Sequence, residues 1–255
     1  MTFPVWLDLF GLRIHPHPVL EGLGYFAGAR LYFALRRRHP SSALPLETTL
    51  WLFVGVLFGA FFGSKLLAWL ESPDLYFGTG DVRDLEGGKT IIGAILGGWL
   101  GVEIAKRACG VRRQTGDLFV YPLALGTAIG RIGCFLTGLS DHTYGIATTL
   151  PWGVDFGDGV YRHPTQLYES LFVLCWAALL WIATRRRQLP SGALFRLYVA
   201  GYFAWRFFIE FIKPREIFLA GLSVLQVTSL AGLAFCLFSL WRLSRPPAPI
   251  PNPVQ

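Results

Sequence analysis

The chain has 255 residues, of which 53% are hydrophobic and 15% are charged, with 29 glycines and a formal net charge of +7. Soluble domains have about 45–50% apolar and about 25% charged residues, so this composition excludes an ordinary water-soluble domain and favours a polytopic membrane protein. In a soluble protein the positive charge would indicate a nucleic-acid partner, but in a membrane protein basic residues first mark the cytoplasmic side.

Seven apolar stretches approach the roughly 20 residues that a bilayer helix needs. In chain order they are Val19–Leu35, Thr48–Leu70, Thr90–Ile104, Leu118–Leu136, Leu167–Ala183, Ala193–Ile212 and Leu219–Trp241. Glycines at roughly helical spacing in the third and fourth stretches predict close packing against neighbouring helices. These glycines are Gly93, Gly97, Gly98, Gly101, Gly126, Gly130 and Gly133. The pattern predicts an all-α integral membrane protein with seven transmembrane helices in one domain, residues 1–245, and a Pro-rich disordered tail, residues 246–255.

Basic residues follow every second span, and this alternation predicts the orientation of the chain. They are Arg36, Arg37, Arg38, Lys106, Arg107, Arg112, Arg113, Arg185, Arg186, Arg187, Arg242 and Arg245. Because cytoplasmic loops carry an excess of Lys and Arg, we expect an external N-terminus, a cytoplasmic C-terminus and a long external loop between the fourth and fifth helices. The loop from Glu71 to Lys89, on the opposite side, is acidic. The positive net charge is then explained without nucleic acid.

We expect neither a cleavable leader nor a disulfide framework. The segment from Met1 to Gly22 has no basic start followed by an apolar run and a small-residue cleavage site. The cysteines show no paired spacing. They are Cys109, Cys134, Cys175 and Cys236.

Some ionisable residues fall within the predicted spans, where a charge costs at least about 2.5–3.5 kcal/mol and usually faces a cavity or a partner. They are Glu21, Arg30, Lys65, Arg131, Arg206 and Glu210. Tyr202, Arg206 and Glu210 have the spacing i, i+4, i+8 and so share one helical face. Either Arg206 and Glu210 neutralise each other as a structural pair, or Arg206 also binds a lipid phosphate through its two-pronged guanidinium.

Arg131 lies between Gly130 and Gly133, and small residues on both sides let a bulky substrate approach its guanidinium. The alternative is an arginine at the end of a helix whose side chain extends to the outer interface.

The N-terminal segment and the long external loop carry further candidates. The loop contains His142, Gly145 and then Arg162-His163-Pro164-Thr165-Gln166-Leu167-Tyr168-Glu169, and long ordered loops tend to be functional. His15, His17 and Glu21 lie at the outer mouth of the first span. This cluster could bind zinc together with His142 or His163. A general base is the preferred interpretation, because a His or a desolvated Glu accepts a proton near neutral pH, and no metal or cofactor is assigned.

Together these segments resemble the prolipoprotein diacylglyceryl transferase family. The family signature Gly-Arg-x-Gly-Asn-Phe is similar to Gly130-Arg131-Ile132-Gly133-Cys134-Phe135. The chain also carries Leu-Pro-Trp-Gly-Val at Leu150–Val154 and Arg-His-Pro-Thr-Gln-Leu-Tyr-Glu at Arg162–Glu169. The family's pattern of Tyr, Arg and Glu at every fourth residue recurs as Tyr202, Arg206 and Glu210. The resemblance extends from about Gly22 to Pro214.

The chain departs from the family pattern at four positions. Cys134 stands at the signature Asn, Leu139 at an acidic residue, Ile92 at a His of the third span and Glu21 at a Tyr of the first span. The two arginines are kept while a candidate base and several polar neighbours are not, which indicates a divergent member.

The resemblance implies an enzyme of the bacterial inner membrane that works at its outer face. It implies transfer of the diacylglyceryl group of phosphatidylglycerol to the lipobox cysteine thiol of a preprolipoprotein, with release of glycerol phosphate. The expected partners are therefore phosphatidylglycerol, preprolipoproteins and the bilayer. We expect catalytic roles for Arg131, Arg206, Glu210, His142 and Glu21, and substrate binding by Tyr202, Arg162, Gln166, Glu169, His17, Gly130, Gly133 and Gly145.

Two alternatives stay open. One is a related membrane transferase that moves a lipid-derived group to another acceptor, which the altered signature permits. The other is a non-catalytic phospholipid-binding membrane protein that keeps the arginines for contact with phosphate.

Overall fold

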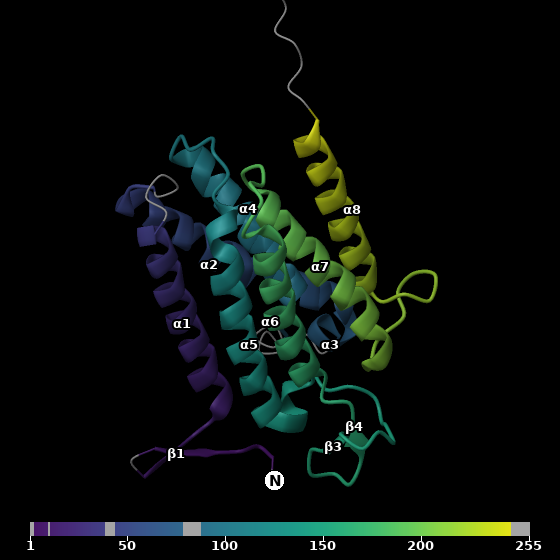
Figure 1. Ribbon diagram of the computed structural model, residues 1–255. Helices are drawn as coiled ribbons and strands as arrows, with labels where there is room; N and C mark the ends of the chain where they lie inside the picture. The colour runs from purple at the N-terminus through teal and green to yellow at the C-terminus, as the bar shows by residue number, and fades with distance from the viewer. Residues whose placement is uncertain (1–2, 10, 39–43, 79–87, 246–255) are drawn as a thin grey trace, which may run out of the picture.

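The computed structural model describes residues 3–9, 11–38, 44–78 and 88–245 (Figure 1). Seven of the α-helices in these ranges have 17 residues or more. They are α1 (Pro16–Arg38), α2 (Leu46–Glu71), α4 (Ile91–Ala108), α5 (Val120–Thr137), α6 (Thr165–Thr184), α7 (Ala193–Ile209) and α8 (Val224–Ser244). The expected disordered tail, residues 246–255, lies outside the described residues, as does part of the acidic loop, residues 79–87.

Within the described residues, four helical stretches are long and apolar enough to cross a membrane. They are Leu46–Glu71, Gly116–Asp141, Thr165–Thr184 and Val224–Ser244. Many large apolar side chains on these helices face outward, for example Phe61, Phe62 and Trp181. Such a surface is stable in lipid and unstable in water, so a mostly helical membrane protein, expected from the sequence, is confirmed.

Short elements join the long helices, and the sequence analysis did not predict them. Two antiparallel hairpins are formed by β1 (Leu7–Leu9) with β2 (Leu12–Ile14) and by β3 (Val154–Asp155) with β4 (Tyr161–Arg162). The short helices are α3 (Pro73–Phe77), η3 (Gly116–Phe119), η4 (Gly138–Asp141) and η5 (Glu210–Ile212). The N-terminus, β1 and the β3–β4 hairpin lie at one end of the bundle, opposite the last turn of α8 (Figure 1).

Several helices begin or end a few residues away from the predicted stretches, and two of these differences frame the loop beside Glu210. The sixth apolar stretch leaves the α-helix at Ile209 and continues as the 3-10 turn η5. The seventh was expected to begin at Leu219, but α8 begins at Val224, because Ser223 and Gln226 form a capping box that fixes the first turn. The segment between η5 and α8 is therefore a loop that starts beside Glu210.

Glycines hold α2 and α4 in close contact, as the third stretch predicted. A Cβ atom added at Gly97 would lie 2.1 Å from the Gly59 carbonyl oxygen, and one added at Gly59 would lie 2.2 Å from the Gly97 carbonyl oxygen. Only glycine permits such an approach of two backbones. Gly98 differs, since its nearest neighbour would be 3.6 Å away, an ordinary contact.

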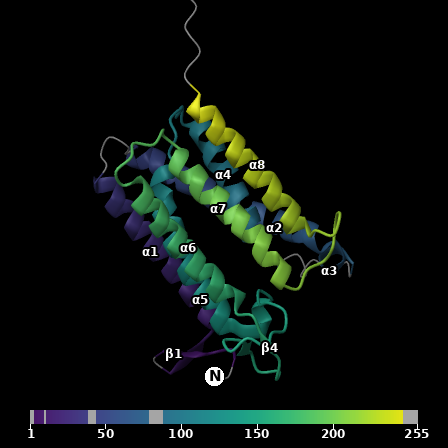
Figure 2. The same ribbon diagram turned by 45° about the vertical axis from the view of Figure 1, so that its right-hand side comes forward.

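Helices α5, α6 and α7 meet where the polar side chains of the spans gather. Figure 1 and Figure 2 both show α5 beside α6 and α7 beside α8. The Ser170 hydroxyl of α6 donates a hydrogen bond to the Ala128 carbonyl of α5 at 3.0 Å. Ala128, Val173 and Tyr202 form a buried cluster that joins the three helices. This packing fixes the helix faces that carry the site.

Candidate functional site

Arg131, Glu169 and Tyr202 form a buried group at the junction of α5, α6 and α7. Arg131 Nη2 lies 2.9 Å from Glu169 Oε2, and both side chains are less than a tenth exposed. The Tyr202 hydroxyl donates a hydrogen bond to Glu169 Oε1 at 2.5 Å. One carboxylate therefore orients both an arginine and a tyrosine. The arginine does not extend to the interface, as one alternative had it, but is buried between helices.

Arg206 and Glu210 lie next to this group, at the end of α7. Arg206 Nη1 is 2.7 Å from Glu210 Oε2, and both side chains are buried. Neither of these two atoms has a well-aligned hydrogen-bond partner among the described residues. The contact is thus an ion pair without an aligned hydrogen bond, and most N–H groups of the Arg206 guanidinium have no acceptor among the described residues. A guanidinium in this state is available to a ligand.

Lys213 is the third buried cation of this site, after Arg131 and Arg206, and it was not among the residues predicted from the sequence. Its backbone N–H donates to the Glu210 carbonyl at 3.2 Å, just after η5, and the residue is 8% exposed. Burial, together with the positive charges of Arg206 and Arg131, lowers the pKa of Lys213 from 10.5 to about 7. The signal in the sequence was a pair of basic residues, Lys213 and Arg215, in a segment where the predicted topology expects few.

Gln166 adds a buried amide to the site. It lies one turn before Glu169 on α6, so the two side chains share a helix face. Neither its amide nitrogen nor its amide oxygen has a hydrogen-bond partner among the described residues, and the same holds for Arg131 Nε. Buried polar atoms without partners are rare. Together with Arg206 they indicate a site that binds a polar ligand.

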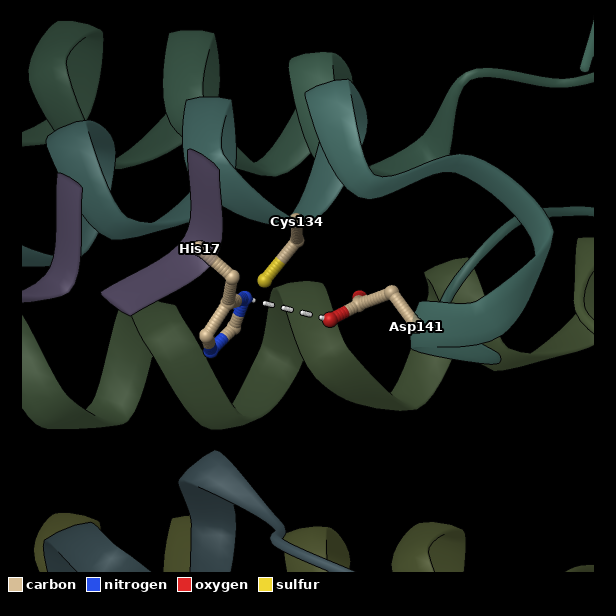
Figure 3. A group of neighbouring side chains, drawn as sticks. All are labelled: His17, Cys134 and Asp141. Carbon is tan, nitrogen blue, oxygen red and sulfur yellow. Dashed lines mark ion pairs between the residues drawn. The ribbon is translucent and has the colours of Figure 1, made fainter. Parts of the chain in front are cut away.

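The N-terminal end of α1 contributes a second polar group, near the first. His17 Nδ1 lies 3.3 Å from Asp141 Oδ1 (Figure 3). His17 Nε2 lies 3.5 Å from Glu21 Oε2. Cys134 joins this group from the last turn of α5, and its sulfur lies 3.8 Å from Arg131 Nη1. The two polar groups are therefore neighbours, and Cys134 lies between them.

Three of the predicted substrate-binding residues lie elsewhere or pack against protein. Arg162 forms an ion pair with Asp158 at 2.7 Å in the β3–β4 hairpin and lies over the Tyr144 ring. A Cβ atom at Gly133 would meet Leu20 of α1 at 3.1 Å, and one at Gly145 would meet His163 at 2.6 Å. These contacts give each residue a structural role, whereas Gly130 has open space around it.

The remaining candidates are dispersed. His142 is exposed in the left-handed region, with φ of 54°. Glu21 accepts a hydrogen bond from Tyr25 and approaches Lys89 at 3.8 Å, so it lies with His17 and not with Arg206. Arg30 lies further along α1, in a hollow that it lines with Phe33, Ala34 and Arg37. Among the described residues, the candidates come together in the Arg131 group, the adjoining Arg206–Glu210 pair and the His17 group.

The comparisons agree on one family. Residues 4–242 match the family model described as prolipoprotein diacylglyceryl transferase. A relative from Clostridium tetani is 33% identical over 226 residues, which cover 82% of this chain and 85% of the relative. One from Trichormus variabilis is 30% identical over 271 residues, 99% of this chain and 93% of the relative. One from Bordetella parapertussis is 32% identical over 273 residues, 95% and 97%.

All three relatives carry the name phosphatidylglycerol–prolipoprotein diacylglyceryl transferase. The matched region is longer than the one that the motifs indicated, because it also includes the N-terminal segment and α8. The chain therefore belongs to the prolipoprotein diacylglyceryl transferase family, a family of transferases.

Proposed function

We propose that this chain transfers the diacylglyceryl group of phosphatidylglycerol to the lipobox cysteine thiol of a preprolipoprotein. The family and the names of its relatives support this activity. The structural observation that carries it is the buried group of Arg131, Arg206 and Lys213, with the unpaired amide of Gln166 beside it. Three buried cations and a buried amide suit a lipid headgroup that carries phosphate and hydroxyls.

The charges of this group match a single phosphodiester. Glu169 compensates Arg131 and Glu210 compensates Arg206, so among these five residues the net positive charge rests on Lys213. The acceptor thiolate attacks the glyceryl carbon and forms the carbon–sulfur bond. The bond between this carbon and the phosphate oxygen breaks, and glycerol phosphate leaves with the electron pair of the broken bond. Cations placed in advance at the phosphate stabilise the charge as it grows, and a low dielectric strengthens their effect.

The thiol, with an ordinary pKa near 8.5, also requires a base. We propose His142 for this role, with Glu21 as the second candidate. His142 is exposed and its imidazole is accessible to an incoming peptide. Glu21 lies beside His17 on α1. The test is the pH dependence of kcat/KM in His142→Ala and Glu21→Gln, and unchanged profiles in both would remove both residues from this role.

We also propose seven membrane spans, an external N-terminus and a cytoplasmic C-terminus in the bacterial inner membrane, with the active site toward the outer side. The basic last turns of α1 and α8 support this orientation, since both lie at the end of the bundle opposite the N-terminus (Figure 1). Reporter fusions at the two termini test it. A fluorescent protein that folds only in the cytoplasm is expected to be active at the C-terminus and inactive at the N-terminus.

The function is tested by complementation and by direct chemistry. In a strain depleted of its own transferase, this chain is expected to restore growth, and mass spectrometry of a lipoprotein N-terminus is expected to show a diacylglyceryl thioether. Arg131→Ala is expected to abolish both, while Arg186→Ala, in the exposed turn after α6, is a matched control that should retain them. Unmodified cysteine despite phosphatidylglycerol binding would instead support a non-catalytic lipid-binding protein.

A further inference from the structure

His17, Cys134 and Asp141 converge on one point although they come from three separate elements. His17 lies in the first turn of α1, Cys134 in the last turn of α5, and Asp141 at the end of η4. One nitrogen of His17, the Cys134 sulfur and one Asp141 oxygen all lie within 4.8 Å of one another. Figure 3 shows the thiol and the carboxylate both directed at the same edge of the imidazole.

The geometry is that of a chelating site and not that of a nucleophile with its base. In a cysteine-histidine-carboxylate triad, the thiol and the carboxylate contact opposite ring nitrogens. Here the ion-pair contact of Asp141 is to Nδ1, at 3.3 Å, and that contact is not a well-aligned hydrogen bond. Ligands at zinc distances of about 2.0–2.3 Å lie roughly 3.3–3.8 Å apart around a tetrahedral ion, so a small closure of the three side chains suffices.

The surroundings supply the outer contacts that metal ligands need. A histidine that binds metal through one nitrogen generally donates its other N–H to a carboxylate, and His17 Nε2 lies 3.5 Å from Glu21 Oε2. Thr143 donates a hydrogen bond to the second oxygen of Asp141. Arg131 Nη1 contacts the Cys134 sulfur at 3.8 Å, which holds the sulfur at this site.

We propose that His17, Cys134 and Asp141 bind a zinc ion. Thiolate and imidazole ligands favour Zn²⁺ over Mg²⁺ or Ca²⁺, which prefer oxygen. The thiolate and the carboxylate carry two negative charges, which balance a divalent cation and leave the loaded site nearly neutral. Three protein ligands leave one tetrahedral position for water or a further ligand. The ligand set differs from the cluster of His15, His17 and Glu21 that the sequence suggested, because Glu21 takes the outer position.

The experiment measures metal content in the full-length chain purified in detergent. After growth with zinc and removal of loosely bound metal, wild type is expected to hold roughly one zinc ion per chain by elemental analysis. Cys134→Asn, which places the family's signature residue there, and Asp141→Asn are both expected to lose it. Cys109→Ser removes an exposed thiol and His15→Ala an imidazole outside the proposed set, and both are expected to keep the metal.

A second measurement identifies the ligand. Loaded with Co²⁺ in place of zinc, wild type is expected to show a thiolate-to-metal absorption band that Cys134→Asn lacks. Wild type without zinc, or zinc retained in both Cys134→Asn and Asp141→Asn, would overturn the proposal. Monodisperse elution in gel filtration checks that each variant is folded. If Cys134→Asn is not folded, the zinc content of Asp141→Asn decides whether the site exists. Because metal content does not depend on transfer, its presence without activity would leave the metal site standing and contradict the proposed function alone.

Discussion

Arg131 on α5 and Glu169 on α6 face each other across the helix interface at 2.9 Å, and Glu169 also accepts a hydrogen bond from Tyr202 on α7. A single carboxylate thus joins three helices and sets the direction of the guanidinium. A buried ion pair contributes little over an apolar core, but removing one partner leaves an uncompensated charge. The pair therefore positions Arg131 for a ligand. Substitution of either partner is expected to destabilise the fold.

Glu169→Gln is expected to impair both folding and transfer. The change keeps the shape of the side chain but leaves Arg131 unpaired, and breaking a buried ion pair costs about 3–5 kcal/mol. Thermal unfolding in detergent and the rate of diacylglyceryl transfer measure the two effects. Asp8→Asn breaks an exposed pair with Arg13 and is the matched control that should change neither. A Glu169→Gln protein with unchanged transfer rate would show that Arg131 needs no positioning.

Arg206→Lys is expected to lose most of the activity although it keeps the positive charge. A lysine ammonium is a point charge and cannot reproduce the two parallel hydrogen bonds of a guanidinium to phosphate. We expect kcat/KM for phosphatidylglycerol in vesicles to fall by about tenfold or more, which corresponds to about 1.4 kcal/mol. Arg186→Lys, in the exposed turn after α6, is the control. More than half of wild-type activity in Arg206→Lys would argue for a purely electrostatic role.

Lys213 is expected to make activity sensitive to pH. Its pKa is lowered to about 7 by burial and by Arg206 and Arg131, so the ammonium form is present below this value and is lost as the pH rises through it. Lys213→Arg stays charged throughout this range. The ratio of kcat/KM in Lys213→Arg to that in wild type is therefore expected to rise from pH 6 to pH 9, by about tenfold per unit above pH 7.

Taking this ratio cancels the titration of the acceptor thiol, which both proteins share. A ratio that stays constant across the pH range would show that the charge of Lys213 plays no part. Lys213→Met, which removes the cation without adding bulk, is expected to be impaired at every pH.

Gly59→Ala is expected to destabilise the α2–α4 contact. The new Cβ atom would lie 2.2 Å from the Gly97 carbonyl oxygen, which is backbone and cannot rotate away. Overpacking of this kind costs about 1–3 kcal/mol. Gly98→Ala, in the same helix pair, meets its nearest atom at 3.6 Å and is the matched control. Thermal unfolding of the two variants in detergent makes the comparison, and equal midpoints would mean that the helices separate at little cost.

Local sequence patterns were sufficient to predict much of the fold and part of the site. Each of the seven long helices overlaps an apolar stretch of the sequence, because burial in lipid requires continuous apolar runs. The spacing of Arg206 and Glu210 likewise predicted their contact, since residues four apart meet on one helix face. The hairpins and the late start of α8 were not predicted, because they depend on turns and a cap whose signals are short.

The sequence by itself determined the class of protein, the approximate positions of the long helices and the family, because composition, periodicity and linear motifs are properties of the chain alone. Only the tertiary structure decided which ionisable residues meet. Arg131 and Glu169 are far apart in the chain, as are His17 and Asp141, and no local spacing relates them. Their contacts arise from the packing of α5 against α6 and α1. Lys213 was missed for the same reason, since its surroundings, and not its neighbours in sequence, bury it among other charges.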